Sequence, residues 1–75
     1  MQEFPAIEFR DGVSGRRAAL REGPDVWEVA MVARDYRGDV GRLETHFGSH
    51  VSRAALTQAL AYAARFPEEI DQWIT

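Results

Sequence analysis

The first part of the chain alternates between apolar and polar residues, whereas the rest does not. In "AIEF" Ile7 and Phe9 fall on one side, and in "RRAAL" Ala18 and Leu20 do the same. Such alternation is typical of strands, and the intervening "RDGVSG" carries two glycines. The pattern predicts a β-hairpin within residues 1–22. Because two strands alone are marginally stable, the hairpin must pack against the remaining residues.

Helical spacing begins after the hairpin. The segment from Pro24 to Gly38 has one apolar stripe, which consists of Val26, Val29, Ala30 and Ala33. Pro24 has a φ suited to a first helical turn. Asp25 and Glu28 put negative charge at the positive end of the helix dipole, and Gly38 can adopt the left-handed conformation that ends a helix. These signals predict a first helix.

Two further helices and a short terminal one follow. Asp39 can cap a helix over "VGRLETHF", which Gly48 ends after about two turns. Ser52 can cap a longer helix, and Pro67 must break it because proline lacks the backbone N–H. "PEEIDQWI" can then restart as a short helix. The inward residues of these segments are Val40, Leu43, Phe47, Leu56, Ala59, Leu60, Ala63, Ile70, Trp73 and Ile74.

A short helix, a glycine-containing turn and a longer helix, braced by a preceding helix, form the plan of a helix-turn-helix. The sequence therefore predicts one mainly α domain over residues 1–75, with the hairpin in 1–22 and the helical part in 23–75. Spacing alone equally allows a three-helix bundle that binds no nucleic acid.

Size and charge narrow the class of protein. A chain of 75 residues buries a thin core, and without cysteine it has no disulfide to reinforce that core. Small domains of this kind commonly gain stability by oligomerising, so we expect a homodimer or a stable protein partner. The net charge of −3 argues against coating nucleic acid by bulk attraction.

Neither a membrane segment nor a secretion signal is evident. No run approaches the roughly 18 apolar residues of a membrane span. The start, "MQEFPAIEF", lacks the basic and apolar regions of a signal peptide. We expect a cytoplasmic protein with no membrane partner.

Three stretches resemble a known family. "PDVWEV", "RGDVGRLETHF" and "ALTQALAYAARFPEEIDQWI" are similar to family 433 of the domains of unknown function, and the likeness covers about residues 15–74. The most specific part is Ala59, Leu60 and Tyr62 followed by "PEEID" and a closing "WI". The resemblance implies a homeodomain-like helix-turn-helix fold. It also implies an antitoxin that regulates transcription and pairs with a PIN-type ribonuclease toxin.

Candidate DNA contacts gather around the third helix. Arg53, Thr57 and Gln58 are predicted on its exposed front, where arginine can bind guanine and glutamine can bind adenine through paired hydrogen bonds. The remaining candidates are phosphate contacts: Ser49, His50 and Ser52 at the N-terminus of that helix, Arg42 on the helix before it, and Arg16 and Arg17 on the hairpin. The alternative is a solvated helix face, with the hairpin arginines serving only to deter edge-to-edge aggregation.

Aromatic and methionine side chains off the main stripe suggest a second apolar face. Trp27, Met31 and Tyr36 lie on the first helix, and Trp73 and Ile74 lie near the C-terminus. A homodimer or another partner protein would use such residues. Packing within one chain explains them equally well.

The sequence offers no catalytic or metal-binding pattern. His46 and His50 are separated by Gly48, and no third ligand has suitable spacing, so we expect neither a metal nor another cofactor. No nucleophile lies beside a base in any recognised arrangement, and we expect no enzymatic activity.

Overall fold

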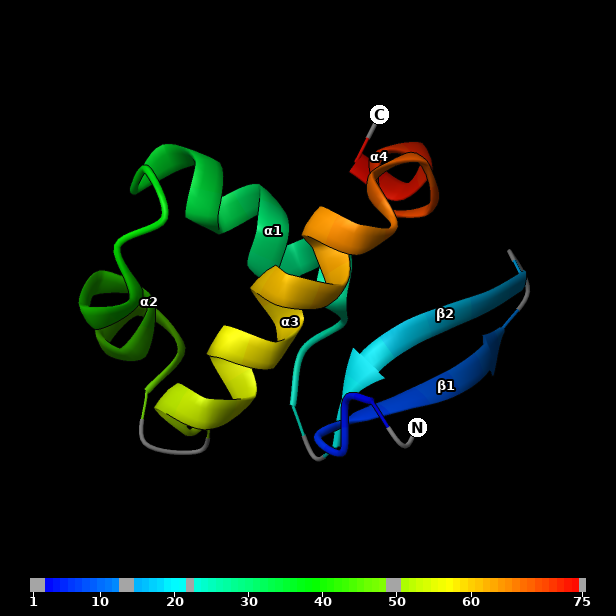
Figure 1. Cartoon of the computed structure of the whole chain (residues 1–75), viewed down its shortest axis with the longest axis horizontal. Coiled ribbons are helices and arrows are strands. Elements are labelled where there is room, and N and C mark those ends of the chain that lie inside the picture. Colours follow the sequence, from blue (N-terminus) through cyan, green and yellow to red (C-terminus); the bar gives the residue numbers. More distant parts are fainter. Residues whose placement is uncertain (1–2, 13–14, 22, 49–50, 75) are drawn as a thin grey trace.

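The structure is a computed structural model that describes residues 3–12, 15–21, 23–48 and 51–74. Two strands and four helices follow one another in this part of the chain (Figure 1): β1 (Ile7–Gly12), β2 (Gly15–Leu20), α1 (Val26–Asp35), α2 (Val40–Phe47), α3 (Arg53–Arg65) and α4 (Pro67–Ile74). The chain is helix-rich with an N-terminal antiparallel hairpin, as predicted. None of the described helices has the length and apolar character needed to cross a membrane.

The apolar residues of the hairpin lie on one side of each strand, as predicted. Ile7 pairs with Leu20 and Phe9 pairs with Ala18, so the apolar residues of both strands share one face. That face packs toward the helices, and Ile7 and Leu20 are almost fully buried. Ala19, on the opposite face, is also fully buried. Its backbone forms an isolated antiparallel bridge with Asp25, which brings the segment before α1 alongside β2.

The helices pack around one core, which α3 crosses at its centre (Figure 1). The predicted stripe of α1 is buried throughout, and Leu43 and Leu56 bring α2 and α3 into the same core. Tyr62 is the core residue of α3 that periodicity did not select. Phe4, Phe9 and Phe66 surround its ring, with centroids 5.4, 6.4 and 4.8 Å away.

The ends of α2, α3 and α4 follow the predicted signals. The Asp39 side chain accepts a hydrogen bond from the Arg42 N–H at the start of α2, and Ser52 accepts one from the Ala55 N–H at the start of α3. Gly48 ends α2 with φ +80°. Pro67 occupies the first position of α4, where its missing N–H costs no hydrogen bond.

The end of α1 differs from the prediction in one residue. The Gly38 N–H donates to the Ala33 carbonyl (2.8 Å) and the Arg37 N–H donates to the Arg34 carbonyl (3.4 Å), which is the Schellman arrangement. The first left-handed residue is therefore Arg37, with φ +54°, and Gly38 follows with φ +79°. A left-handed conformation costs a non-glycine residue about 1 kcal/mol or more.

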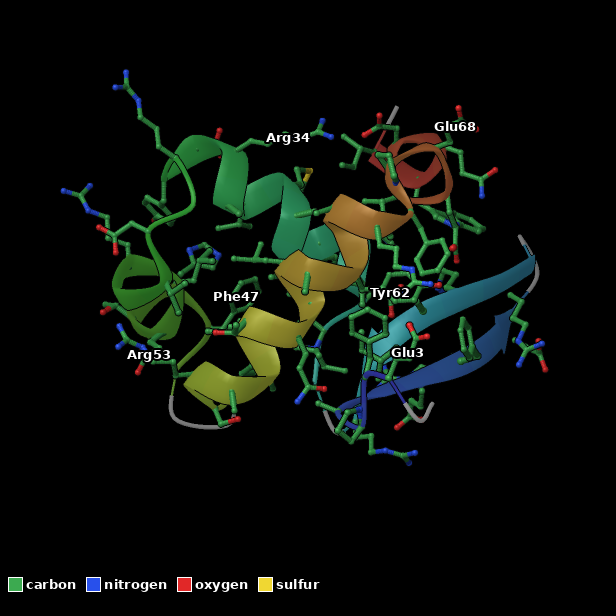
Figure 2. All side chains as sticks on the ribbon, in the orientation of Figure 1. Glu3, Arg34, Phe47, Arg53, Tyr62 and Glu68 are labelled. Atoms are coloured by element: carbon green, nitrogen blue, oxygen red, sulfur yellow. The ribbon has the colours of Figure 1, made fainter. Side chains whose placement is uncertain are left out.

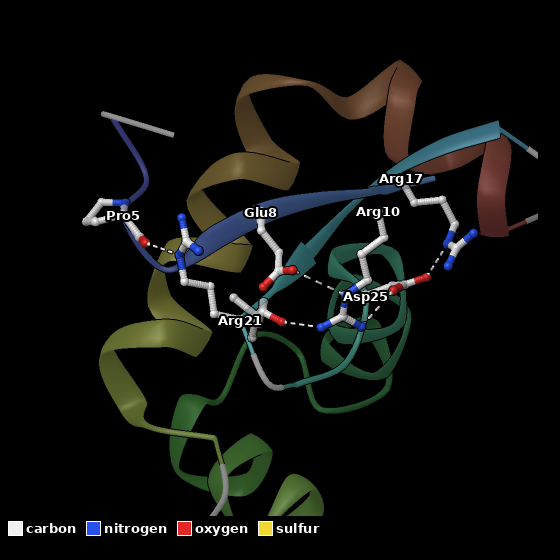
Figure 3. A network of polar contacts seen from close by, with 7 residues as sticks. Pro5, Glu8, Arg10, Arg17, Arg21 and Asp25 are labelled. Carbon is white, nitrogen blue, oxygen red and sulfur yellow. Dashed lines mark hydrogen bonds and ion pairs between the residues drawn. The ribbon is translucent and has the colours of Figure 1, made fainter. Parts of the chain in front are cut away.

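Asp25 lies at the N-terminal end of α1, as predicted, and its carboxylate also makes contacts that the sequence did not indicate. It precedes α1, yet its side chain makes no capping hydrogen bond. Its carboxylate accepts a hydrogen bond from Arg17 Nε (2.7 Å), and Arg10 lies 3.8 Å away (Figure 3). It also accepts a hydrogen bond from Trp27 Nε1 (3.1 Å). Since both arginines belong to the hairpin, this buried carboxylate fastens the hairpin to the start of α1.

Candidate nucleic-acid interface

The start of α3 presents a polar surface beside α2. Leu56 and Ala59 face the core, whereas Ser52, Arg53 and Thr57 are exposed. This exposure follows from helical spacing, because residues four apart share a face and the buried stripe occupies the other side. Figure 2 shows Arg53 next to α2, at the side of the molecule away from the hairpin.

Arg53 is exposed but has a carboxylate partner. Its Nε donates to Glu44 Oε1 on α2 at 2.6 Å, and 66% of its side chain is accessible to solvent. An exposed ion pair of this kind contributes about 0–1 kcal/mol. The guanidinium can therefore exchange Glu44 for another anion at small cost.

The hydroxyl groups near Arg53 are partly engaged within α3. Thr57 donates its hydroxyl hydrogen to the Arg53 carbonyl at 2.9 Å, and Ser52 accepts from the Ala55 N–H at 3.1 Å. Thr57 therefore keeps acceptor capacity toward solvent, and Ser52 keeps a donor hydrogen.

The prediction for Gln58 is wrong. Its side chain is half-buried, and its amide oxygen accepts a hydrogen bond from the Ala6 backbone N–H at 2.7 Å. Gln58 lies about 140° around the helix from Arg53, five residues earlier, so it faces the N-terminal segment and not the exposed front. It holds that segment against α3.

Arg42 lies where the sequence suggested, on the exposed side of α2. Its Nε is 3.7 Å from the Asp39 carboxylate, a loose contact, and 70% of its side chain is accessible. Arg53 Nη2 reaches to 3.8 Å from the position that a Cβ on Gly41 would take. The first turn of α2 and the first turn of α3 are thus adjacent, and both carry an exposed arginine.

The hairpin arginines are not part of this surface. The tip of the hairpin and α2 lie at opposite ends of the longest axis (Figure 1). Arg17 is bound to Asp25, and the Arg16 guanidinium lies over the Phe9 ring, 4.5 Å from its centroid. Their structural role, as anchors of the hairpin, is therefore visible within one chain.

The residues predicted for a dimer interface have mixed surroundings. Trp27, Tyr36 and Ile74 are half-buried and pack against the core. Trp73 is half-buried beside Gly15, and its buried Nε1 has no hydrogen-bond partner among the residues that the structure describes. Met31 is the large apolar side chain that stands open among the described residues, with 40% of it exposed.

A buried tyrosine hydroxyl escaped the sequence interpretation. Tyr62 donates to Glu69 on α4, with its oxygen 2.8 and 3.0 Å from the two carboxylate oxygens. Burial raises the pKa of Tyr62 well above its ordinary value, and the hydrogen bond and charge of Glu69 raise it further, against a smaller opposing effect of Arg16. The contact ties α4 to α3. Tyr62 and Glu69 are seven residues apart on either side of Pro67, so helical spacing within one helix does not indicate that they meet.

Ser49 and His50 lie outside the described residues. Within the described ranges, no three His, Asp or Glu side chains gather so as to hold a metal ion. The His46 ring packs on Tyr36 and Phe47, with centroids 6.0 and 4.9 Å apart.

Comparison of the chain with protein-family models, curated proteins and solved structures found no match.

Proposed function

We propose that the chain is a DNA-binding transcriptional regulator in which α1, α2 and α3 form a homeodomain-like helix-turn-helix and α3 enters the major groove. The observation that carries this proposal is the exposed first half of α3, with Arg53 and Thr57 in front and Leu56 fixed in the core behind them. A rigid helix with a polar front edge is what base readout in the major groove requires.

The modest charge of one chain supports a dimeric form of the proposal. With a net charge of −3, a single copy is repelled by DNA at long range, so its binding would depend on close contacts at the interface. Two copies would set two α3 helices in successive major grooves, and the second contact would then form at high effective concentration. The exposed Met31 and the half-buried Trp27, Tyr36, Trp73 and Ile74 are the proposed source of that dimer or partner surface.

The resemblance to family 433 extends the proposal to an antitoxin. In that case one surface binds operator DNA and another neutralises a PIN-type ribonuclease. Co-expression of the chain with a PIN-type ribonuclease encoded beside it tests this extension. Growth rescue together with co-purification of the two proteins supports it, and an unrelieved toxic effect counts against it.

The DNA proposal is tested with two matched arginine variants of α3. Arg53 and Arg65 stand at opposite ends of the helix, are similarly exposed, and each pairs with one glutamate at 2.6 or 2.7 Å. Arg53→Ala is expected to weaken operator binding by about 1–3 kcal/mol. Arg65→Ala is expected to leave it unchanged. Equal affinities for the two variants in a band-shift assay would contradict the proposal.

Glu44 provides a test in the opposite direction. Because its carboxylate holds Arg53 and lies near the surface that would face phosphate, Glu44→Gln both frees the guanidinium and removes a repulsive charge. The variant is expected to bind DNA more tightly than the natural chain, most clearly at low salt. A loss of affinity would mean that Arg53 works only when Glu44 positions it.

A protein-interaction module is the alternative function. Two observations favour it. Four arginines already bind carboxylates within the chain and are therefore less available to phosphate: Arg17, Arg34, Arg53 and Arg65. In addition, α3 exposes alanine side chains at Ala54, Ala61 and Ala64. A salt titration with random-sequence duplex separates the functions. Binding that falls steeply with salt indicates phosphate contacts, and absence of binding at low salt indicates a protein partner.

A further inference from the structure

Arg37 occupies a backbone position that disfavours it. It follows the C-cap of α1 with φ +54°, in the left-handed region where glycine carries no penalty. The chain has a glycine at the very next residue, so the Schellman arrangement would form at least as well with glycine at both positions. An arginine side chain is thus held here at the expense of stability, which is a mark of functional positions.

The guanidinium of Arg37 also differs from those of the other arginines, because it has no carboxylate, carbonyl or aromatic partner among the described residues. The other eight arginines each contact a carboxylate, a carbonyl oxygen or an aromatic ring: Arg10, Arg16, Arg17, Arg21, Arg34, Arg42, Arg53 and Arg65. Arg37 is exposed and makes no such contact with any described residue. Its side chain is therefore available for an external anion without loss of an internal bond.

The neighbours of Arg37 connect it with the surface around α3. Arg37 and Arg42 line the same shallow hollow at the corner between α1 and α2, and Arg53 reaches the first turn of α2 from the other side. The hollow also contains Asp35 and Asp39. Asp39 is engaged with the start of α2, whereas Asp35 is exposed and repels an approaching anion.

We propose that Arg37, together with Arg42, binds a backbone phosphate of DNA at the α1–α2 corner. The contact orients the protein on the duplex, so that α3 meets the bases in one register, and carries no sequence information of its own. The inference rests on the proposed DNA-binding function and adds to it a residue that sequence patterns did not single out.

Replacement of Arg37 by glycine gives a test with opposite signs. Arg37→Gly relieves the left-handed strain, so the melting temperature should rise by a few degrees for a domain of this size. The same change removes one phosphate contact, so the slope of log affinity against log salt should become shallower by about 0.9. Between 50 and 200 mM salt, the variant should then lose about 3.5-fold less affinity than the natural chain.

Four further variants isolate the contribution of the guanidinium charge. Arg37→Gln should weaken binding to random-sequence duplex as Arg37→Gly does, although it keeps the strain. Arg37→Lys should retain most of the salt slope because it keeps the charge, and Asp35→Asn should bind more tightly. Arg65→Gln removes the same charge from the far end of α3 and should leave the slope unchanged.

The outcomes distinguish this inference from the function on which it rests. A stabilised Arg37→Gly variant with unaltered affinity and salt slope overturns the phosphate contact, even when Arg53→Ala is defective. A natural chain that binds neither its own upstream DNA nor random duplex at low salt overturns both proposals. A lower melting temperature for Arg37→Gly overturns the strain argument.

Discussion

Removal of the Asp25 carboxylate should detach the hairpin from the helical body. Only 11% of the Asp25 side chain is exposed, and it accepts a hydrogen bond from Arg17 at 2.7 Å (Figure 3). It also accepts a hydrogen bond from Trp27 at 3.1 Å. In Asp25→Ala, Arg17 loses its anion, and the indole N–H of Trp27 loses its acceptor. Arg10 keeps its hydrogen bond to the Leu20 carbonyl and suffers less.

The cost of this substitution can be estimated from its parts. A hydrogen bond to a charged group contributes about 1.5–3 kcal/mol, and a neutral donor left without an acceptor costs about 1 kcal/mol more. The sum, about 2.5–4 kcal/mol, stays below the cost of breaking a fully buried pair because the Arg17 side chain is 26% exposed and regains water. A chain of 75 residues has a total stability of about 4–11 kcal/mol, so the loss is a large share of it.

Urea denaturation followed by tryptophan fluorescence and circular dichroism measures the effect. Glu3→Ala is the matched control, since Glu3 and Arg65 are also 2.7 Å apart but both side chains are more than half exposed. It should cost about 0–1 kcal/mol. Asp25→Asn, which keeps one acceptor oxygen, should fall between the two variants. If Asp25→Ala and Glu3→Ala lose the same free energy, burial does not govern the strength of these pairs and the reasoning fails.

Substitutions at three other positions test the core and the helix ends. Tyr62→Phe should cost about 1 kcal/mol of stability near neutral pH. Because burial raises the pKa of Tyr62, the natural chain should lose about 1.4 kcal/mol of stability per pH unit once the pH passes the ordinary tyrosine value of about 10. Urea titrations at alkaline pH should show this loss for the natural chain and not for the variant. Ser52→Ala removes the cap of α3 and should cost about 1 kcal/mol in the same assay, whereas Ser52→Asp should not. Gly48→Ala forces a side chain to φ +80° and should lower the melting temperature by several degrees, although no atom lies within 4 Å of the added methyl group.

The elements of this fold are predictable because local chemistry determines them. The caps Asp39 and Ser52, the turn at Gly48 and the break at Pro67 each depend on neighbours within four residues, and all lie where the sequence indicates. The sides of the hairpin strands are equally local, since alternation puts Ile7 and Phe9 on one side of β1 and Ala18 and Leu20 on one side of β2.

The partners of polar side chains are not local, and here prediction from the sequence fails. Gln58 binds the Ala6 N–H, 52 residues away along the chain, so helical periodicity could not distinguish it from an exposed reader. Asp25 lies at the start of α1 as predicted, but no local pattern indicates that its carboxylate binds Arg17 of the hairpin and not the free N–H groups of α1. A charged hydrogen bond in a buried place outweighs a cap that water can replace.

The ion pairs within the chain determine how much each arginine would gain by contacting DNA. Arg53 already has an anion in Glu44, so a phosphate replaces one partner with another, and the direct Coulomb gain is small. Arg37 has no described partner and gains the whole contact. Affinity on the proposed interface would therefore come mainly from the α1–α2 corner and from counterion release. Arg53 would contribute specificity, because a guanine offers its paired acceptors in the plane of the guanidinium, whereas a phosphate does not distinguish one base from another. Arg53, the side chain best placed to read sequence, must therefore first break its ion pair with Glu44. DNA sites where a guanine fully replaces that ion pair are favoured over sites that offer no such base.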